Sequence, residues 1–322
     1  MSNAGSPVPR ILRLLPRIAI GGALLGLLIA RSGVDELRRT FASVAPEPLV
    51  GAFVLIVIGV AVSAIRWSAF LDALGAHRTY LYLTRLYWIG LFFNSFLPTG
   101  IGGDVFKAIR VRRTHEPMSP AFASVLLDRI SGLVGLAAMG CVAAVDRIAV
   151  GDRSRAVVAA LGLSVAVIIG CALLPLTPKV VRFVPWVGRV GAAHRALDAI
   201  RIGIRTPAVA GRGFAWGVVY QATVVAFHFA LLEGLHLHVP LAALVCVVVV
   251  VTFASLLPIT INGLGVREGI FIWTLAHYGI SAHESVAMGL LVLGLLLAAS
   301  AVGGIVYLVL GADAPPVESA NA

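Results

Sequence analysis

The chain has 322 residues, of which 59% are hydrophobic and 12% are charged, and its mean hydropathy is +0.98. Soluble domains are typically about 45 to 50% apolar and about 25% charged, so these values exclude a soluble fold of this length. The formal net charge of +10 is concentrated at the ends of apolar segments, a pattern typical of membrane proteins and not of nucleic-acid binding.

Continuous apolar segments recur along the whole chain. A membrane-spanning helix needs about 20 mainly apolar residues, whereas the strands of a transmembrane β-barrel are about 10 residues of alternating polarity. The pattern therefore predicts an all-α, polytopic integral membrane protein with about 6 to 8 transmembrane helices. The segments lie at residues 11–30, 49–65, 80–97, 120–145, 156–176, 213–235, 239–258 and 284–311, with a shorter one at 268–280.

Basic residues set the expected orientation. Arg10, Arg13 and Arg17 precede the first segment, and no A-x-A cleavage signal follows it. We therefore expect a signal anchor with a cytoplasmic N-terminus, after which the second segment returns the chain at Arg66. The basic loop 177–212 is then cytoplasmic, and its apolar residues at helical spacing between Val190 and Ile204 fit an interfacial helix or a plain connector equally well.

We expect one transmembrane domain, residues 1–312. Its halves, about 10–176 and 213–312, are joined by the basic loop. Residues 313–322 are short and polar and are expected to be a disordered tail.

The two halves share a sequence repeat. FNSFLPTGIGG at 93–103 matches FASLLPITING at 253–263 in six of 11 positions, at an offset of 160 residues (253 minus 93). Each copy interrupts an apolar segment with Pro and Gly, and paired interruptions of this kind indicate a transport site. We predict two re-entrant-like broken segments in an inverted repeat. The alternative is ordinary loops between complete spans, with eight helices and no cavity.

Charged residues lie within or beside these apolar segments, where each costs roughly 2.5 to 3.5 kcal/mol on insertion scales. Asp128 and Arg129 are expected about 13 Å into their helix and point about 100° apart, so each needs a partner elsewhere. We predict that Asp104 pairs with Arg129 and that Arg267 pairs with Asp128. The competing interpretation is a purely structural ion-pair network.

The backbone amides that follow each break, together with these charges, predict an anion site for a phosphate-bearing headgroup. The predicted substrate-binding residues are Asn94, Pro98, Gly102, Gly103, Asp104, Lys107, Asp128, Arg129, Pro258, Asn262, Gly263, Gly265, Arg267 and Glu268.

No catalytic residue, cofactor or metal is predicted. His228, His236 and His238 near Glu233 lack the spacing of a metal site. The three cysteines are expected to pack in the core. The aromatic residues Tyr80, Tyr82, Tyr87 and Trp88 are expected to form a belt at the membrane interface.

Three blocks carry a resemblance to a known family. FFNSFLPTGIGGDVFKAIRVRR (92–113), SVLLDRISGL (124–133) and LPITINGLGVREG (257–269) resemble the signature blocks of the lysylphosphatidylglycerol synthase transmembrane-domain family. The likeness covers about residues 10–312. Residues 259–262 are less Gly-rich than the family usually is, which puts the identity of the substrate in question.

The resemblance implies lipid translocation by a flippase, not an enzyme. Because the chain ends soon after its last span, we expect a stand-alone member that lacks the soluble synthase domain. The implied ligands are membrane lipids, with an anionic headgroup favoured. The implied location is the bacterial inner membrane, and lipid-modifying enzymes or glycosyltransferases are candidate partners.

Two alternatives remain open at this point. One is a membrane-embedded enzyme that uses a polyprenyl-phosphate donor and binds a divalent cation at Asp35 and Glu36. The other is an accessory subunit in a glycolipid or hopanoid pathway.

Overall fold

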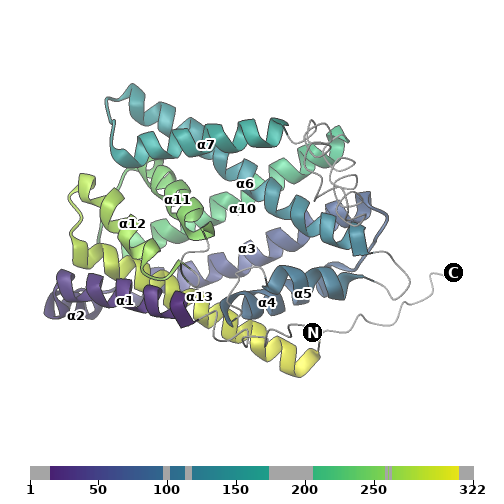
Figure 1. The fold of residues 1–322 in the computed structure, drawn as a ribbon, viewed down its shortest axis with the longest axis horizontal. Coiled ribbons are helices and arrows are strands. Elements are labelled where there is room, and N and C mark those ends of the chain that lie inside the picture. The colour runs from purple at the N-terminus through teal and green to yellow at the C-terminus, as the bar shows by residue number, and fades with distance from the viewer. Residues whose placement is uncertain are drawn as a thin grey trace, which may run out of the picture.

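A computed structural model describes residues 15–96, 102–112, 118–173, 206–257, 260 and 263–311 (Figure 1). Throughout these residues the regular elements are helices, which confirms the all-α fold. The predicted interfacial helix at 190–204, most of the basic loop and the tail at 313–322 lie outside the described residues.

Five of the described helices are long and apolar enough to cross a membrane. They are α3 (Pro46–Ala73), α6 (Met118–Ala149), α7 (Arg155–Leu173), α10 (Pro207–Gly234) and α13 (Ala282–Leu310). The other helices are α1 (Leu15–Ser32), α2 (Val34–Ala42), α4 (Tyr80–Phe96), α5 (Gly102–Val111), α11 (Leu241–Leu256) and α12 (Val266–Leu275), which the 3₁₀ turn η5 (Ala276–Tyr278) follows. The sequence did not predict α2 or α5 as separate helices.

The predicted repeat is visible in the order and length of the helices. In the first half, α3, α4, α5 and α6 have 28, 17, 10 and 32 residues. In the second half, α10, α11, α12 and α13 have 28, 16, 10 and 29 residues. Each half is therefore a long helix, a shorter helix, a break, a ten-residue helix and a second long helix.

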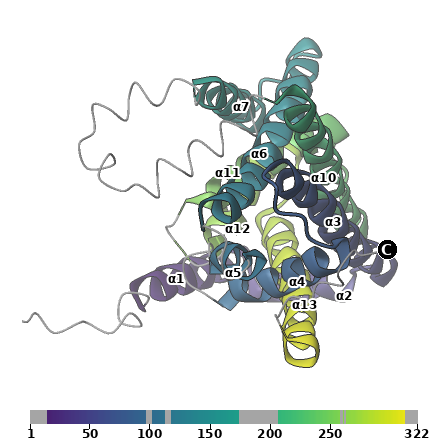
Figure 2. The same ribbon diagram turned by 90° about the vertical axis from the view of Figure 1, so that its right-hand side faces the viewer.

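The halves are inverted relative to each other, because α3 and α10 lie side by side and run antiparallel (Figures 1 and 2). Ala45 N, just before α3, donates to Gly234 O at the end of α10 across 2.9 Å. At the other end, Phe70 near the end of α3 lies against Gly213 near the start of α10. The helices that follow cross between halves, since α4 packs on α13 and α11 packs on α6.

The first broken segment is a re-entrant hairpin. The helix α5 turns back along α4, so that Gly103 lies against Gly90. At the open end of the hairpin, Tyr82 Oη donates to Arg110 O across 2.7 Å and Arg78 Nε donates to Val111 O across 2.8 Å. The chain therefore leaves on the side where it entered, which excludes the alternative of a complete span at this break.

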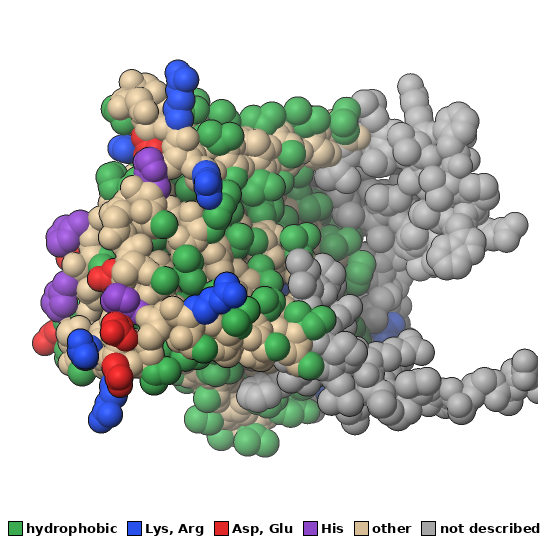
Figure 3. Space-filling view, turned by 60° about the vertical axis from the view of Figure 1, so that its left-hand side comes forward, with side chains coloured by type: hydrophobic (Ala, Val, Ile, Leu, Met, Phe, Trp, Pro, Cys, Tyr) green, Lys and Arg blue, Asp and Glu red, His purple; other side chains and the backbone are tan. Residues whose placement is uncertain are grey.

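The second broken segment has the same form. Ser255 near the end of α11 lies against Gly263, just before α12, and α12 packs along α11. Charged and His side chains gather at the end of the molecule that carries α2 and η5, beyond which hydrophobic side chains cover the flank (Figure 3). This distribution fits a protein embedded in a bilayer.

A polar network at that end joins the α6–α7 connection to η5. Asp152 Oδ2 accepts from Tyr278 Oη (3.0 Å) and Arg147 Nε (3.1 Å), and its Oδ1 accepts from Ser154 N (2.9 Å). Burial acts to raise the pKa of Asp152, but the hydrogen bonds from Ser154, Tyr278 and Arg147 outweigh it and hold that pKa below its ordinary value. Burial and the neighbouring carboxylate raise the pKa of Tyr278 to about 12.

These shifts predict a pH-dependent contribution to stability. Because the folded-state pKa of Asp152 is lowered, its contribution is complete above the unfolded-state value of about 4 and is lost as the pH falls through the folded-state pKa. We expect Asp152→Asn to lower the free energy of unfolding by about 1 kcal/mol between pH 5 and 8. Unfolding in detergent micelles at a series of pH values measures this difference, which should shrink below about pH 4.

The matched control is Asp146→Asn, which removes an exposed carboxylate from the same end of α6. A pH-independent difference for Asp152→Asn, or an equal effect of Asp146→Asn, would contradict this role of the network.

Candidate functional site

Charged side chains from three helices meet inside the first half of the bundle, in what we call the central cluster: Arg66, Asp104, Lys107, Asp128 and Arg129. They come from α3, α5 and α6. Asp128 lies 10 positions after Met118, the first residue of α6, which is about 15 Å along the helix axis at 1.5 Å per residue. The cluster therefore lies inside the helix bundle and not at its end.

One part of the central cluster is the pair of Arg66 and Asp128. Arg66 Nε donates to Asp128 Oδ1 across 2.7 Å, and the two side chains are only 5% and 3% exposed. Tyr87 Oη donates to the other carboxylate oxygen. The predicted pairing of Arg267 with Asp128 is therefore wrong. The reason is that α3 continues beyond Arg66 to Ala73, which places this arginine inside the bundle and not at its edge.

The other part is built on Asp104, and here the prediction is confirmed. Arg129 donates to Asp104 Oδ2 from Nε and from its terminal nitrogen, each across 2.8 Å. Lys107 Nζ lies 3.1 Å from Asp104 Oδ1. The same ammonium lies 4.0 Å from the centre of the Tyr87 ring and 5.3 Å from that of Trp67, so aromatic faces also stabilise it.

The two parts are connected through Tyr87, which touches Lys107 with its ring and Asp128 with its hydroxyl. Three cations share two carboxylates, so the central cluster carries a surplus of one positive charge. Arg129 is 45% exposed, whereas the other four side chains are at most 10% exposed. The surplus charge is therefore presented at Arg129.

Polar groups at the first break form hydrogen bonds with one another. Asn94 Oδ1 accepts from Gly103 N across 2.8 Å, and Gly103 is pressed against the backbone of Gly90. Asn94 thus caps α5, which Gly102 begins. Of the amides that we predicted to be free for an anion, that of Gly103 is already engaged.

At the second break, too, polar groups bond to one another. Gly263 and Gly265 have positive φ angles of 71° and 79°, which favour glycine. Glu268 Oε2 accepts from Gly265 N across 2.6 Å, and its Oε1 accepts from Arg267 across 2.9 Å. Arg267 and Glu268 are 5% and 0% exposed, so they form a neutral, buried pair that belongs to the break and is separate from the central cluster.

Two acidic residues occupy equivalent places in the repeat. Asp104 is the third residue of α5 and Glu268 is the third residue of α12. A carboxylate in the first turn interacts favourably with the helix dipole. Each carboxylate also binds an arginine, Arg129 in the first half and Arg267 in the second. Pro98, Pro258 and Asn262 lie outside the described residues.

Sequence reasoning missed Arg66, Trp67 and Tyr87. Of the expected interface belt, Tyr80 is exposed, but Tyr82 is only 4% exposed and Tyr87 is turned inward, where its hydroxyl reaches Asp128. The apolar and aromatic residues that follow Arg66 were the available signal, since they continue the helix to Ala73.

The acidic pair Asp35 and Glu36 lies in the first turn of α2, where it interacts with the helix dipole. In the part of the chain that the structure describes, no three His, Cys, Asp or Glu side chains are grouped so that they could hold a metal ion.

Comparisons with known proteins agree with this architecture. The family model for the lysylphosphatidylglycerol synthase TM region matches residues 15–310. Among curated proteins, the chain is 22% identical to a UPF0104 membrane protein of Methanothermobacter thermautotrophicus over 294 residues, which is 84% of this chain and 87% of the relative.

Two further UPF0104 membrane proteins match over shorter stretches. The one from Methanocaldococcus jannaschii is 27% identical over 105 residues, and the one from Pyrococcus horikoshii is 25% identical over 120 residues. These alignments span 31% and 36% of those relatives and 32% and 36% of this chain. The match to the family model is the broader finding, because it covers both hairpins and every described helix. The chain belongs to the lysylphosphatidylglycerol synthase TM region family.

Proposed function

We propose that this protein moves a phospholipid, or another lipid with an anionic headgroup, between the two leaflets of a bacterial inner membrane. The observation that carries the proposal is the surplus positive charge of the central cluster, presented at the half-exposed Arg129. An ionisable group at this depth is costly and is typically retained for a function.

The geometry suggests how a headgroup binds. In the lipid-free protein Arg129 shares the single carboxylate of Asp104 with Lys107. An incoming phosphate, which an arginine can bind through two parallel hydrogen bonds, competes with that carboxylate for the guanidinium. Asp104 keeps Lys107 as a partner at 3.1 Å, so the exchange leaves no buried charge alone. The acyl chains stay in the surrounding lipid.

The inverted repeat supplies a means of movement. Two hairpins that enter from opposite ends, in halves that meet along α3 and α10, suit a motion in which one half rocks against the other. The headgroup would then meet the same cationic site from either leaflet.

Charge at the ends of the helices supports an orientation. The end that carries the open side of the first hairpin has Arg78, Arg110 and Arg112, and Arg212 lies in the first turns of α10. The opposite end mixes both signs, as with Asp35 and Arg38 on α2. By the positive-inside tendency the first end faces the cytoplasm, as does the N-terminus.

Lipid-modifying enzymes or glycosyltransferases are proposed as partners that make or consume the transported lipid. This part of the proposal rests on the family alone, since the relatives' names say only that they are membrane proteins.

The test is leaflet exchange of fluorescent phospholipids in proteoliposomes, read as the fraction of headgroups accessible to an added quencher. We expect the wild type to accelerate exchange of an anionic lipid and Arg129→Ala to reduce the rate at least tenfold. Arg129 is the informative substitution because it is half-exposed and Asp104 retains Lys107 after its loss. Arg39→Ala, an exposed arginine on α2, is the matched control and should exchange lipid at the wild-type rate.

If the Arg129→Ala variant exchanged lipid at the wild-type rate, the headgroup would not pass the central cluster. Absence of exchange with every lipid tested would favour an accessory subunit of a lipid-modifying enzyme over a flippase.

A further inference from the structure

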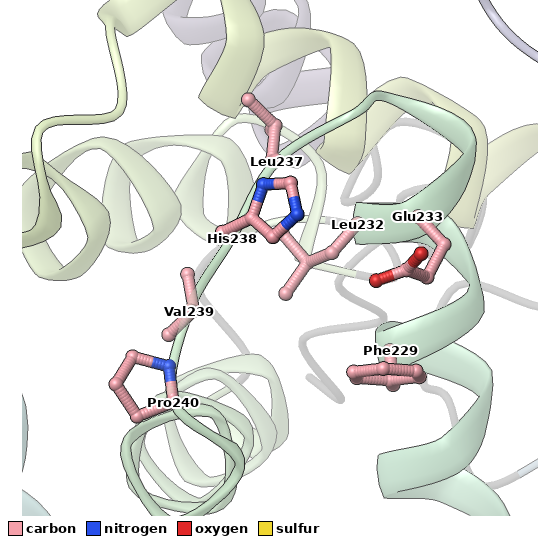
Figure 4. Close-up of a pocket in the computed structure, with 7 residues that line it drawn as sticks. All are labelled: Phe229, Leu232, Glu233, Leu237, His238, Val239 and Pro240. Carbon is pink, nitrogen blue, oxygen red and sulfur yellow. The ribbon is translucent and has the colours of Figure 1, made fainter.

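A second candidate site lies at the end of α10, in the other half of the repeat from the central cluster. Here the chain leaves α10 and passes through residues 235–240 into α11, and beside this connection lies a half-open surface cavity of about 280 Å³ (Figure 4). The cavity is lined by Phe229, Leu232, Glu233, His238, Val239 and Pro240, among others.

The cavity has an apolar part and a polar rim. Phe229 and Glu233 are four residues apart on α10, so they lie one above the other on the same face, with Glu233 nearer the end of the helix. In Figure 4 the Glu233 carboxylate and the His238 ring point into the same space, while Phe229 and Pro240 lie on either side below them. The apolar part therefore lies along α10 and the polar rim lies at the end of that helix.

The rim also carries an unbalanced charge. Among the described residues no salt bridge or side-chain hydrogen bond involves Glu233, and what sets it apart from other exposed carboxylates at this end, such as Glu47 and Asp146, is its place on the rim of the cavity. The cavity opens to the surface of the protein beside apolar side chains, since Phe229 is 42% exposed and the adjoining Leu241 is 60% exposed. An unpaired carboxylate above an apolar cavity at a membrane boundary favours an amphiphile with a positively charged headgroup.

We propose that this cavity binds a phospholipid whose headgroup carries a primary ammonium. The ammonium donates to the Glu233 carboxylate and to the unprotonated ring nitrogen of His238, and the first carbons of an acyl chain lie along Phe229, Val239 and Pro240. A primary ammonium has three N–H donors and can donate to two acceptors at once, whereas a quaternary ammonium has no N–H donor.

This site is distinct from the one proposed for transport. The central cluster presents a surplus cation and selects anions, while the α10 cavity presents a surplus carboxylate and selects cations. Binding here holds a lipid at the rim of the protein and requires no movement between leaflets, so the two proposals can fail separately.

The experiment is retention of lipid by the full-length protein, purified from nanodiscs that contain equal parts of phosphatidylethanolamine, phosphatidylcholine and phosphatidylglycerol, and measured by native mass spectrometry. We expect retention of phosphatidylethanolamine over phosphatidylcholine by about threefold, the scale of a partly exposed ion pair. Glu233→Gln keeps the size of the side chain and should abolish this preference.

Two further variants make the result decisive. Glu47→Gln removes an exposed carboxylate at the same end, in the first turn of α3, and should leave the preference unchanged. Val239→Phe fills the cavity and should reduce retention of every lipid. An unchanged preference in Glu233→Gln, or equal loss in Glu47→Gln, would overturn the proposal, because the preference would then arise elsewhere or from overall surface charge.

Discussion

Asp128→Asn is expected to lower the free energy of unfolding by about 3 to 5 kcal/mol, the cost of breaking a buried ion pair by removing one partner. Arg66 is 4% exposed and its Nη1 already lacks a hydrogen-bond partner. Loss of the Asp128 charge would leave this guanidinium as an uncompensated cation within the bundle. Unfolding by SDS in mixed micelles, followed by tryptophan fluorescence, measures the change.

The control is the double variant Arg66→Leu, Asp128→Leu. Replacing both members of a buried ion pair by apolar residues is often neutral or stabilising, so we expect it to be more stable than Asp128→Asn. If the double variant is no more stable, the loss comes from packing around α3 and α6 and not from the unpaired charge.

Gly103→Ala is expected to destabilise the first hairpin by about 3 kcal/mol. A Cβ added at Gly103 would lie 2.1 Å from Gly90 O and 2.8 Å from Asn94 Oδ1. The nearest atom belongs to the backbone, so α5 would have to move away from α4, and the Gly103–Asn94 hydrogen bond that caps α5 would break. Overpacking of this kind typically costs 1 to 3 kcal/mol, to which the lost cap adds about 1 kcal/mol.

Gly162→Ala on α7 is the matched substitution, since an added Cβ there has nothing within 4 Å. It should leave stability unchanged or raise it by up to about 1 kcal/mol, because Ala favours a helix over Gly. Equal unfolding midpoints for the two variants would mean that the close approach of α4 and α5 does not limit stability.

The sequence predicted the larger features because their causes are local. Apolar runs interrupted by Pro and Gly specify where helices stop, and the match at 93–103 and 253–263 located both hairpins. The repeat in the structure is not in constant register, however. The helices α3 and α10 start 161 residues apart (207 minus 46), whereas α5 and α12 start 164 apart (266 minus 102). The connection between α11 and α12 is therefore longer than the one between α4 and α5.

Prediction of the candidate site was less complete because the ion pairs depend on how the helices pack against one another, which local sequence patterns do not specify. Asp104 and Arg129 were paired correctly from their places after the break and within the next span. Asp128 was assigned the wrong arginine because hydropathy falls at Arg66, although the helix does not end there. A charged arginine lowers the hydropathy average, but it does not interrupt the hydrogen bonds of a helix. The helix α3 ends only at Ala73, just before Gly75 with its positive φ of 72°.

The surplus charge of the central cluster has an electrical consequence. With Lys107 and the two arginines protonated, the cluster holds one net positive charge within the bilayer, where a full crossing of a 100 mV potential changes the energy of a unit charge by about 2.3 kcal/mol. Binding of a singly charged phosphodiester at Arg129 cancels that charge. The lipid-loaded protein would then reorient without sensing the membrane voltage, while the return of the empty protein would be driven or opposed by it.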